Sequence, residues 1–243
     1  MSDPVLLVTG GATGIGAAVA TLATEQGCKV AICDVNEAAG SALAEQLDGR
    51  FIPCDVTSLA SVSDAVARCE AELGVPTYAH LNAGIMTVPT GAPYLAIEDV
   101  SEAQYHNIVG VNLDGVFHGA KVLLPKMRAA GGAITITASI AGLSAVPVDP
   151  MYTATKYALV GFGRAVAAAN EGSNVRINVI CPGVTDTQIV PDDYKAAEYN
   201  MMPAEVMALE VVDLLKRGAN GEIRVKMATD QPAFVAELPN LRG

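Results

Sequence analysis

The chain has 243 residues and a formal net charge of −11, with 51% hydrophobic and 17% charged residues. This balance excludes a disordered chain and is typical of a protein with a full hydrophobic core. Its Lys and Arg residues form no cluster and its first apolar run covers only residues 5–8, so we expect no nucleic-acid partner and no membrane segment.

Short apolar segments alternate with longer amphipathic segments along the chain. The predicted strands cover residues 5–9, 29–33, 51–54, 78–81, 133–138, 175–180 and 222–227. The predicted helices between them cover residues 15–26, 37–47, 59–73, 102–129, 151–170 and 204–217. This alternation predicts βαβ units and a Rossmann-type, doubly wound parallel sheet with helices on both faces, in a single α/β domain over residues 1–243.

The two edges of this sheet can be assigned from residue type. Pro53 lies in the third strand, and proline lacks the N–H group that a central strand needs. The seventh strand, 222–227, alternates charged and apolar residues, which suits a half-exposed edge. We therefore expect seven strands in the order 3-2-1-4-5-6-7.

A glycine-rich turn, with the sequence TGGATGIG at 9–16, joins the first strand to the first helix. Gly10, Gly14 and Gly16 would let the backbone turn tightly and approach a pyrophosphate, which the free N–H groups of the helix start would bind. The alternative is a glycine-rich turn without a ligand. The strand before it and the helix after it favour dinucleotide binding.

Asp34 ends the second strand, where a carboxylate would accept hydrogen bonds from the adenosine ribose and repel the 2′-phosphate of NADP. No Lys or Arg stands at positions 13, 35 or 36 to bind that phosphate. These features predict NAD as the cofactor. A helix N-cap role for Asp34 is a second, compatible interpretation.

Tyr152 and Lys156 are four residues apart, on one face of a predicted helix. A neighbouring ammonium would lower the pKa of the phenol and make it an acid/base for an alcohol or ketone. Taken alone, the pair could equally be a helix surface pair. Ser139 ends the fifth strand, where its hydroxyl would hydrogen-bond the substrate oxygen or simply cap the strand.

Together these motifs resemble the short-chain dehydrogenase/reductase family. The likeness extends from residue 5 to about residue 187, and its further motifs are Asp55-Val56, Asn82-Ala83-Gly84, Asn112, and Pro182-Gly183 leading to Thr187. The resemblance implies a catalytic tetrad of Asn112, Ser139, Tyr152 and Lys156. In it, Asn112 would kink its helix and hold a water that relays protons to Lys156, which would also bind the nicotinamide ribose.

The resemblance also implies a cofactor-binding set. Asp55 and Val56 would meet the adenine, and Asn82-Ala83-Gly84 would close the cleft. Pro182, Gly183 and Val184 would pack beside the nicotinamide, and Thr187 would contact its carboxamide. Thr13, Ile15 and Val35 complete the implied set. Beyond it, a substrate lid is implied around residues 187–203.

Three departures from the family pattern stand out. Leu81 replaces a common asparagine, and the stretch between Gly84 and Asn112 is longer than usual. The tail lacks the usual Asp-Gly-Gly and is more similar to the NAD-dependent prostaglandin dehydrogenase branch.

The family likeness also implies a homodimer or homotetramer.

Six side chains form the expected substrate site: Ser139, Tyr152, Ile140, Met86, Leu143 and Tyr194. The apolar members predict a hydrophobic secondary alcohol or ketone, although core or lid packing is an alternative for about half of the apolar candidates.

Two rival functions are compatible with the same fold. One is a non-catalytic NAD(H)-binding sensor or scaffold, and the other is an epimerase or dehydratase.

The five cysteines and three histidines show no metal-ligand spacing, so we expect no metal site. Cys33, Cys54 and Cys181 lie in or beside apolar runs and are interpreted as small buried residues. Reduced thiols are typical of a cytoplasmic protein.

Overall fold

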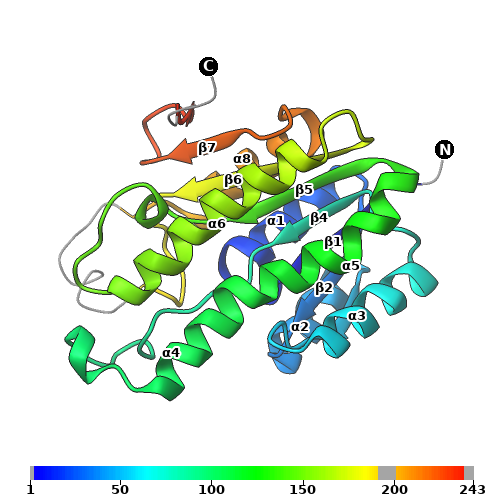
Figure 1. The fold of residues 1–243 in the computed structure, drawn as a ribbon. Helices are drawn as coiled ribbons and strands as arrows, with labels where there is room; N and C mark the ends of the chain where they lie inside the picture. Colours follow the sequence, from blue (N-terminus) through cyan, green and yellow to red (C-terminus); the bar gives the residue numbers. More distant parts are fainter. Residues whose placement is uncertain (1–2, 191–200, 238–243) are drawn as a thin grey trace.

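The computed structural model describes residues 3–190 and 201–237 (Figure 1). Its described strands form one sheet in the order β3-β2-β1-β4-β5-β6-β7-β8. The bounds are β1 (Val5–Thr9), β2 (Lys29–Asp34), β3 (Arg50–Pro53), β4 (Tyr78–Leu81), β5 (Gly132–Thr137), β6 (Val175–Pro182), β7 (Ile223–Lys226) and β8 (Phe234–Val235). The first seven strands pair in parallel, which confirms the predicted Rossmann-type α/β fold.

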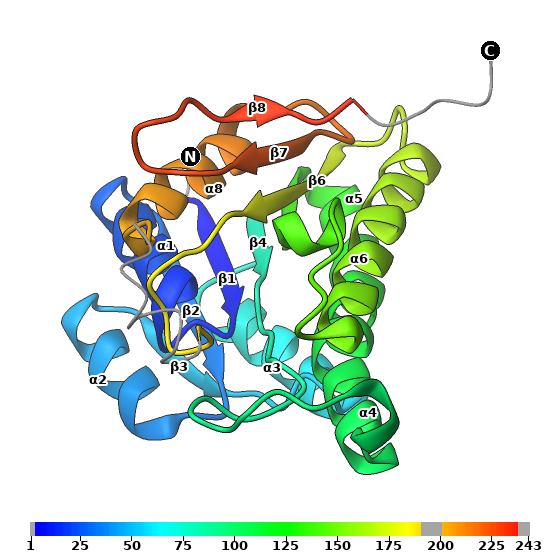
Figure 2. The ribbon, with the colours of Figure 1, turned by 90° about the vertical axis from the view of Figure 1, so that its left-hand side faces the viewer.

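Helices cover both faces of the sheet (Figure 2). One face carries α1 (Gly14–Glu25), α2 (Glu37–Gln46) and α8 (Ala204–Arg217). The other carries α3 (Leu59–Glu72), α5 (Gly115–Ala130) and α6 (Pro150–Ala169). Because successive side chains of a strand point to opposite faces, Leu7 of β1 packs in one core, and Leu6 and Val8 pack in the other.

The predicted helix 102–129 is divided into three parts. α4 (Glu102–Val109) and α5 flank a π-helical turn over Gly110–Asp114, which contains Asn112. Such a turn locally disturbs the regular helical hydrogen bonding. Asn112, where the family likeness implies a kink, lies within this turn.

The prediction that the seventh strand forms an edge is wrong. After β7 the chain turns back, and β8 pairs antiparallel with it, with Val225 opposite Phe234. This short return strand was not predicted because two residues carry no periodic signal, and both are about half exposed (Phe234 52%, Val235 54%). It covers the backbone groups that β7 would otherwise present to solvent.

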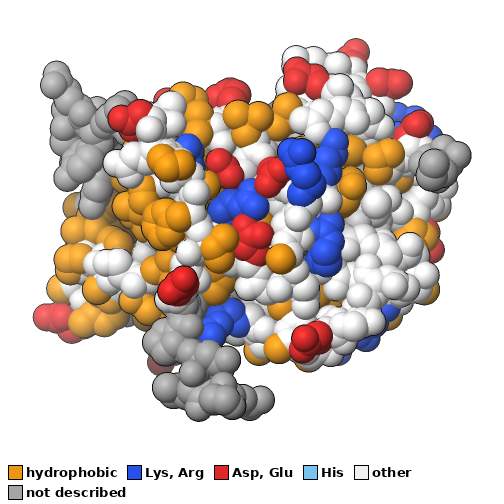
Figure 3. Space-filling view, turned by 90° about the horizontal axis from the view of Figure 1, so that it is seen from above, with side chains coloured by type: hydrophobic (Ala, Val, Ile, Leu, Met, Phe, Trp, Pro, Cys, Tyr) orange, Lys and Arg blue, Asp and Glu red, His pale blue; other side chains and the backbone are white. Residues whose placement is uncertain are grey.

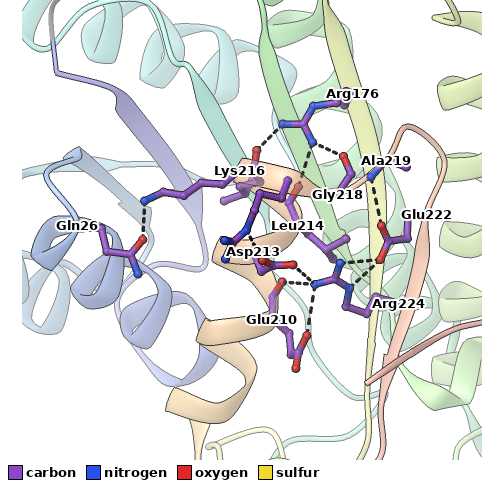
Figure 4. A network of polar contacts seen from close by, with 12 residues as sticks. Gln26, Arg176, Glu210, Asp213, Leu214, Lys216, Gly218, Ala219, Glu222 and Arg224 are labelled. Atoms are coloured by element: carbon purple, nitrogen blue, oxygen red, sulfur yellow. Dashed lines mark hydrogen bonds and ion pairs between the residues drawn. The ribbon is translucent and has the colours of Figure 1, made fainter. Parts of the chain in front are cut away.

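Arg224 of β7 holds helix α8 against this end of the sheet (Figure 4). Its guanidinium pairs with Asp213 at 2.7 Å and Glu210 at 3.3 Å, both on α8, and with Glu222 at 2.7 Å. The hydrogen bond from Arg224 is the main reason that the pKa of Asp213 is lowered. Figure 3, seen from above this end, shows basic and acidic side chains interspersed rather than gathered by sign.

Candidate active site

A cavity of about 820 Å³ opens where the central parallel strands end. Gly10 follows β1, Asp34 ends β2, Asn82 follows β4, and Ser139 follows β5. All four line the cavity together with Tyr152 of α6. Parallel α/β sheets bind ligands at this edge because every strand delivers its following loop there.

The glycine-rich turn forms one end of the cavity. Gly10 has a φ of +61° and Gly14 a φ of +56°, conformations that favour glycine. A Cβ on Gly16 would overlap the carbonyl oxygen of Gly10. Thr13, the N-cap of α1, makes no side-chain cap, so the first N–H groups of the helix are left for another acceptor. This cradle fits a pyrophosphate at a helix start.

Asp34 lies beside this cradle and ties it to β2. Its Oδ2 accepts a hydrogen bond from the backbone N–H of Ala12 at 3.0 Å, and its Oδ1 accepts one from Asn36 at 2.9 Å. The N-cap interpretation of Asp34 is wrong, because the side chain of Asn36 caps α2 by accepting from Ala39. Asp34 lines the cavity, and each of its oxygens keeps lone-pair capacity for a further donor.

Tyr152 and Lys156 occupy one face of α6, as their spacing predicts. The Lys156 ammonium is buried, donates to the carbonyl of Thr137 at 3.0 Å, and lies 5.4 Å from the centre of the Tyr152 ring. Ser139 hydrogen-bonds the Tyr152 phenol. The structure thus gathers a hydroxyl, a phenol and an ammonium at one wall of the cavity.

Burial is the main influence on the pKa values of Tyr152 and Lys156. It raises the pKa of Tyr152 to about 12, partly offset by the hydrogen bond from Ser139 and reinforced by the charge of Asp149. Burial also lowers the pKa of Lys156 to about 8. The pKa of the phenol therefore shifts in the direction opposite to the lowering predicted from the Tyr152–Lys156 spacing, because desolvation of the phenolate is the largest effect.

Asn112 is fully buried and lies behind the cavity rather than in its lining. Its Oδ1 accepts from the N–H of Ile85 at 2.8 Å, while its Nδ2 donates to the carbonyl of Ile85 and to the Thr155 hydroxyl. The side chain thus ties the π-helical turn to the loop after β4 and to α6. A Cβ on Gly84 would lie 3.4 Å from the Lys156 ammonium and 3.5 Å from Oδ1 of Asn112.

Asn82 joins the central strands at the cavity floor. Its Nδ2 donates to the carbonyl of Gly10 at 3.1 Å, and its Oδ1 accepts from the Thr137 hydroxyl at 3.1 Å. Asp55, by contrast, accepts from the N–H and hydroxyl of Thr57 and so shapes its own turn.

Most of the predicted site residues share the cavity. Besides those already placed, its lining includes Thr13, Gly14, Ile15, Val35, Asp55, Val56, Ala83, Gly84, Met86, Ile140, Lys156, Pro182, Gly183, Val184 and Thr187. Gly16 and Leu143 lie outside the lining, and Leu143 instead packs against the core beneath α6. Residues 191–200 of the expected lid, which include Tyr194, lie outside the described residues.

Several cavity residues were not predicted. Tyr94 lines the wall near Tyr152, and the Thr90 hydroxyl donates to the carbonyl of Gln188 at 2.5 Å, across the cavity rim. Thr87 also lines the wall and is bound by Asp149. Asp149, which lies behind this wall rather than in the lining, carries a sequence signal, as a capping residue directly before a helix-starting proline.

Residues 3–190 and 201–237 include no helix with the length and hydrophobicity of a membrane span. They contain no group of three or more His, Cys, Asp and Glu side chains arranged for a metal ion. All five cysteines are free and buried, which agrees with their interpretation as small buried residues.

Comparisons with known proteins identify the family. The model of the short chain dehydrogenase family matches residues 4–198. The 3-alpha-(or 20-beta)-hydroxysteroid dehydrogenase of Mycobacterium bovis is 35% identical over 219 residues, which cover 85% of this chain and 80% of that protein. The mitochondrial borneol dehydrogenase of Lavandula x intermedia is 33% identical over 241 residues, which cover 97% and 87%.

A solved structure supports the fold independently. The 3-ketoacyl-(acyl-carrier-protein) reductase from Brucella melitensis, complexed with NADH, superposes with a TM-score of 0.83 at 23% identity, over 93% of this chain and 96% of that one. The family match and the identities to two dehydrogenases lead to one conclusion: the chain belongs to the short-chain dehydrogenase family and is an oxidoreductase.

Proposed function

We propose that the protein is an NAD-dependent alcohol dehydrogenase and ketone reductase, with Tyr152 as its acid/base. The observation that carries this proposal is the meeting of Ser139, Tyr152 and Lys156 at one wall of a cavity whose other end is a phosphate cradle. A cradle suited to a dinucleotide and a set of groups suited to proton transfer therefore line one cavity.

The cofactor end of the cavity fits NAD. Gly10, Thr13 and Gly14 would hold the pyrophosphate, and Asp34 would bind the adenosine ribose and disfavour a 2′-phosphate. Lys156 would bind the nicotinamide ribose, while Pro182 to Thr187 would pack beside the nicotinamide. When bound there, NAD(H) accepts or supplies the hydride.

The chain's own groups then manage the proton. In ketone reduction, the Ser139 hydroxyl hydrogen-bonds the carbonyl oxygen, and the protonated Tyr152 phenol donates its proton to that oxygen. A raised phenol pKa of about 12 keeps this donor protonated at neutral pH. In alcohol oxidation the same phenol oxygen takes the proton from the hydroxyl. Lys156 is proposed to pass that proton onward through a water held by Asn112, as the family likeness implies.

The lining of the cavity favours an uncharged, hydrophobic substrate. The substrate side carries apolar residues, among them Met86, Ile140 and Val146. Lys156 is the only Lys or Arg among the described lining residues, so an anionic substrate finds no other cation. The names of two relatives, a hydroxysteroid dehydrogenase and a borneol dehydrogenase, support a hydrophobic secondary alcohol or ketone.

Assembly and location are further parts of the proposal. Exposed aromatic side chains on α4, α5 and α6, namely Tyr105, Phe117 and Tyr157, support a homodimer or homotetramer built on these helices. The five buried free thiols suit the reducing cytoplasm.

A panel assay tests the reaction. Purified protein is mixed with NAD and secondary alcohols, or with NADH and ketones, and NADH absorbance is followed. Steady turnover supports the dehydrogenase, whereas NADH binding without turnover of any panel member favours a non-catalytic sensor. The same panel with NADP tests the cofactor.

Replacing Tyr152→Phe should abolish turnover, with a loss of at least 10²-fold expected for a general acid/base. NADH affinity should stay within about twofold, because the ring and its packing are kept. Steady-state rates measure turnover, and fluorescence titration with NADH measures its affinity. A Tyr157→Phe variant, which removes an exposed phenol from the same helix, is the matched control. Full activity of Tyr152→Phe would refute the proposed role.

A further inference from the structure

Asp149 is a buried carboxylate directly before the catalytic helix. Only 2% of its surface is exposed, and no ion pair in the described residues involves it. Its Oδ1 accepts from the N–H of Tyr152 at 2.9 Å and from the Thr87 hydroxyl at 2.5 Å. Its Oδ2 accepts from the N–H of Thr87 at 2.9 Å.

These bonds exceed what a helix start requires. An N-cap needs one oxygen acceptor, and an uncharged serine or asparagine serves as well as aspartate. Here both oxygens also reach Thr87, a residue 62 positions away in the wall of the cavity. Burying a carboxylate without a cation is costly unless its hydrogen bonds are strong and complete. The arrangement therefore joins two walls of the site and does more than cap α6.

We propose that Asp149 is a positioning residue that, with Thr87, fixes the first turn of α6 and so places the Tyr152 phenol against the substrate. We call this pair the 87–149 clamp. The proposal rests on the proposed dehydrogenase function. Asp149 acts through Tyr152 and Thr87, since it does not line the cavity itself.

The clamp has an electrostatic consequence that distinguishes it from simple packing. Besides burial, three groups act on the phenol: Ser139 by its hydrogen bond, and Asp149 and Tyr94 electrostatically. The Lys156 ammonium faces the same ring, 5.4 Å from its centre. The negative charge of Asp149 raises the pKa of Tyr152. Removing that charge favours the phenolate, so the pKa of Tyr152 should fall.

Two variants separate the geometric and electrostatic parts. Asp149→Ser keeps an N-cap oxygen but removes the charge and both bonds to Thr87. Thr87→Val keeps the charge and the side-chain shape but removes the hydroxyl donor. With a ketone from the panel, kcat should fall about 10- to 100-fold in Asp149→Ser and about tenfold in Thr87→Val, since small displacements of an acid cost this much. NADH affinity should change less than twofold in both.

The pH profile supplies the sharper test. Ketone reduction needs protonated Tyr152, so its rate falls at high pH as the phenol ionises, well above the pH at which Lys156, with a pKa of about 8, loses its charge. This fall should move to lower pH in Asp149→Ser and stay in place in Thr87→Val. Loss of a merely structural contact would lower the rate without moving the profile.

Hydrogen exchange followed by mass spectrometry tests the clamp without substrate or cofactor. In Asp149→Ser, exchange should accelerate in residues 85–90 as well as 150–156, although the two segments are far apart in sequence. Ser58→Ala is the matched control, because it removes the N-cap of α3 without touching either segment. It should lower the unfolding temperature but leave kcat and both segments unchanged.

Defined results would overturn the proposal. Wild-type kcat and an unmoved pH profile in both variants would exclude a positioning role. Unchanged exchange of residues 85–90 in Asp149→Ser, or in Thr87→Val if the first variant does not fold, would exclude the clamp. If the wild type reduces no ketone, the proposed function fails, and the exchange experiment alone then decides the clamp.

Discussion

At the scale of single residues, the environment of a side chain decides its chemistry. The spacing of Tyr152 and Lys156 correctly placed them on one helix face, and Ser139 lies beside the phenol. The direction of the phenol pKa shift followed instead from burial, which raises it to about 12. Residue type and spacing therefore indicate which groups meet, while solvent exclusion sets their protonation.

Asp34 is the residue on which cofactor choice should depend. Asp34→Ala removes the carboxylate that repels a 2′-phosphate and that would bind the ribose, so the ratio of kcat/KM for NAD over NADP should fall at least tenfold. Asp64→Ala, an equal charge change on the exposed side of α3, should leave the ratio unaltered. A wild type that already prefers NADP would show that Asp34 has been misassigned.

At the scale of elements, helix α6 carries Tyr152 and Lys156 and packs closely on the sheet at Gly163. A Cβ on Gly163 would overlap Cγ2 of Val179 on β6, whereas a Cβ on Gly161 of the same helix would meet nothing within 4 Å. Val179 is buried, with 1% of its surface exposed. The absence of a side chain at Gly163 therefore sets how closely the Tyr152 helix approaches the strands.

Two alanine variants of α6 should have opposite effects. Gly163→Ala should lower the free energy of unfolding by about 1–3 kcal/mol, because the tightly packed core must shift. Gly161→Ala should raise it by about 0.4–1 kcal/mol, because alanine restricts the unfolded chain at an open helical site. Urea unfolding followed by circular dichroism measures both. Equal effects of the two changes would contradict the close packing of α6.

At the scale of the whole molecule, one continuous sheet separates two hydrophobic cores. Alternate residues of the same strands belong to the core beneath α1 and α8 and to the core beneath α5 and α6. Because both cores share the same strands, unfolding of one core would also expose the apolar residues of the other. The described chain is therefore expected to behave as one folding unit.

Thermal unfolding should accordingly show a single cooperative transition. Far-UV circular dichroism reports on the backbone, and the near-UV signal reports on the seven tyrosines, since the chain contains no tryptophan. The two curves should coincide, with one midpoint. Two separated midpoints would show that the chain divides into independent units and would refute the single domain expected from the sequence.

The sequence by itself was sufficient for the features that depend on local pattern. Apolar periodicity predicted the positions of β1 to β7 and of the helices between them, and Pro53 correctly marked β3 as an edge. The glycine turn, Asp34 and the Tyr152 motif predicted residues that do line one cavity. Each of these signals lies within one element or at its end, where residue type and spacing act directly.

Features that join distant segments depend on the three-dimensional fold. The return of β8 onto β7, the bonds between Thr87 and Asp149, and the position of Leu143 outside the cavity depend on which parts of the chain meet. The protonation of Tyr152 depends on how completely neighbouring elements exclude water from it. Contacts and desolvation of this kind arise between elements, so no local pattern encodes them.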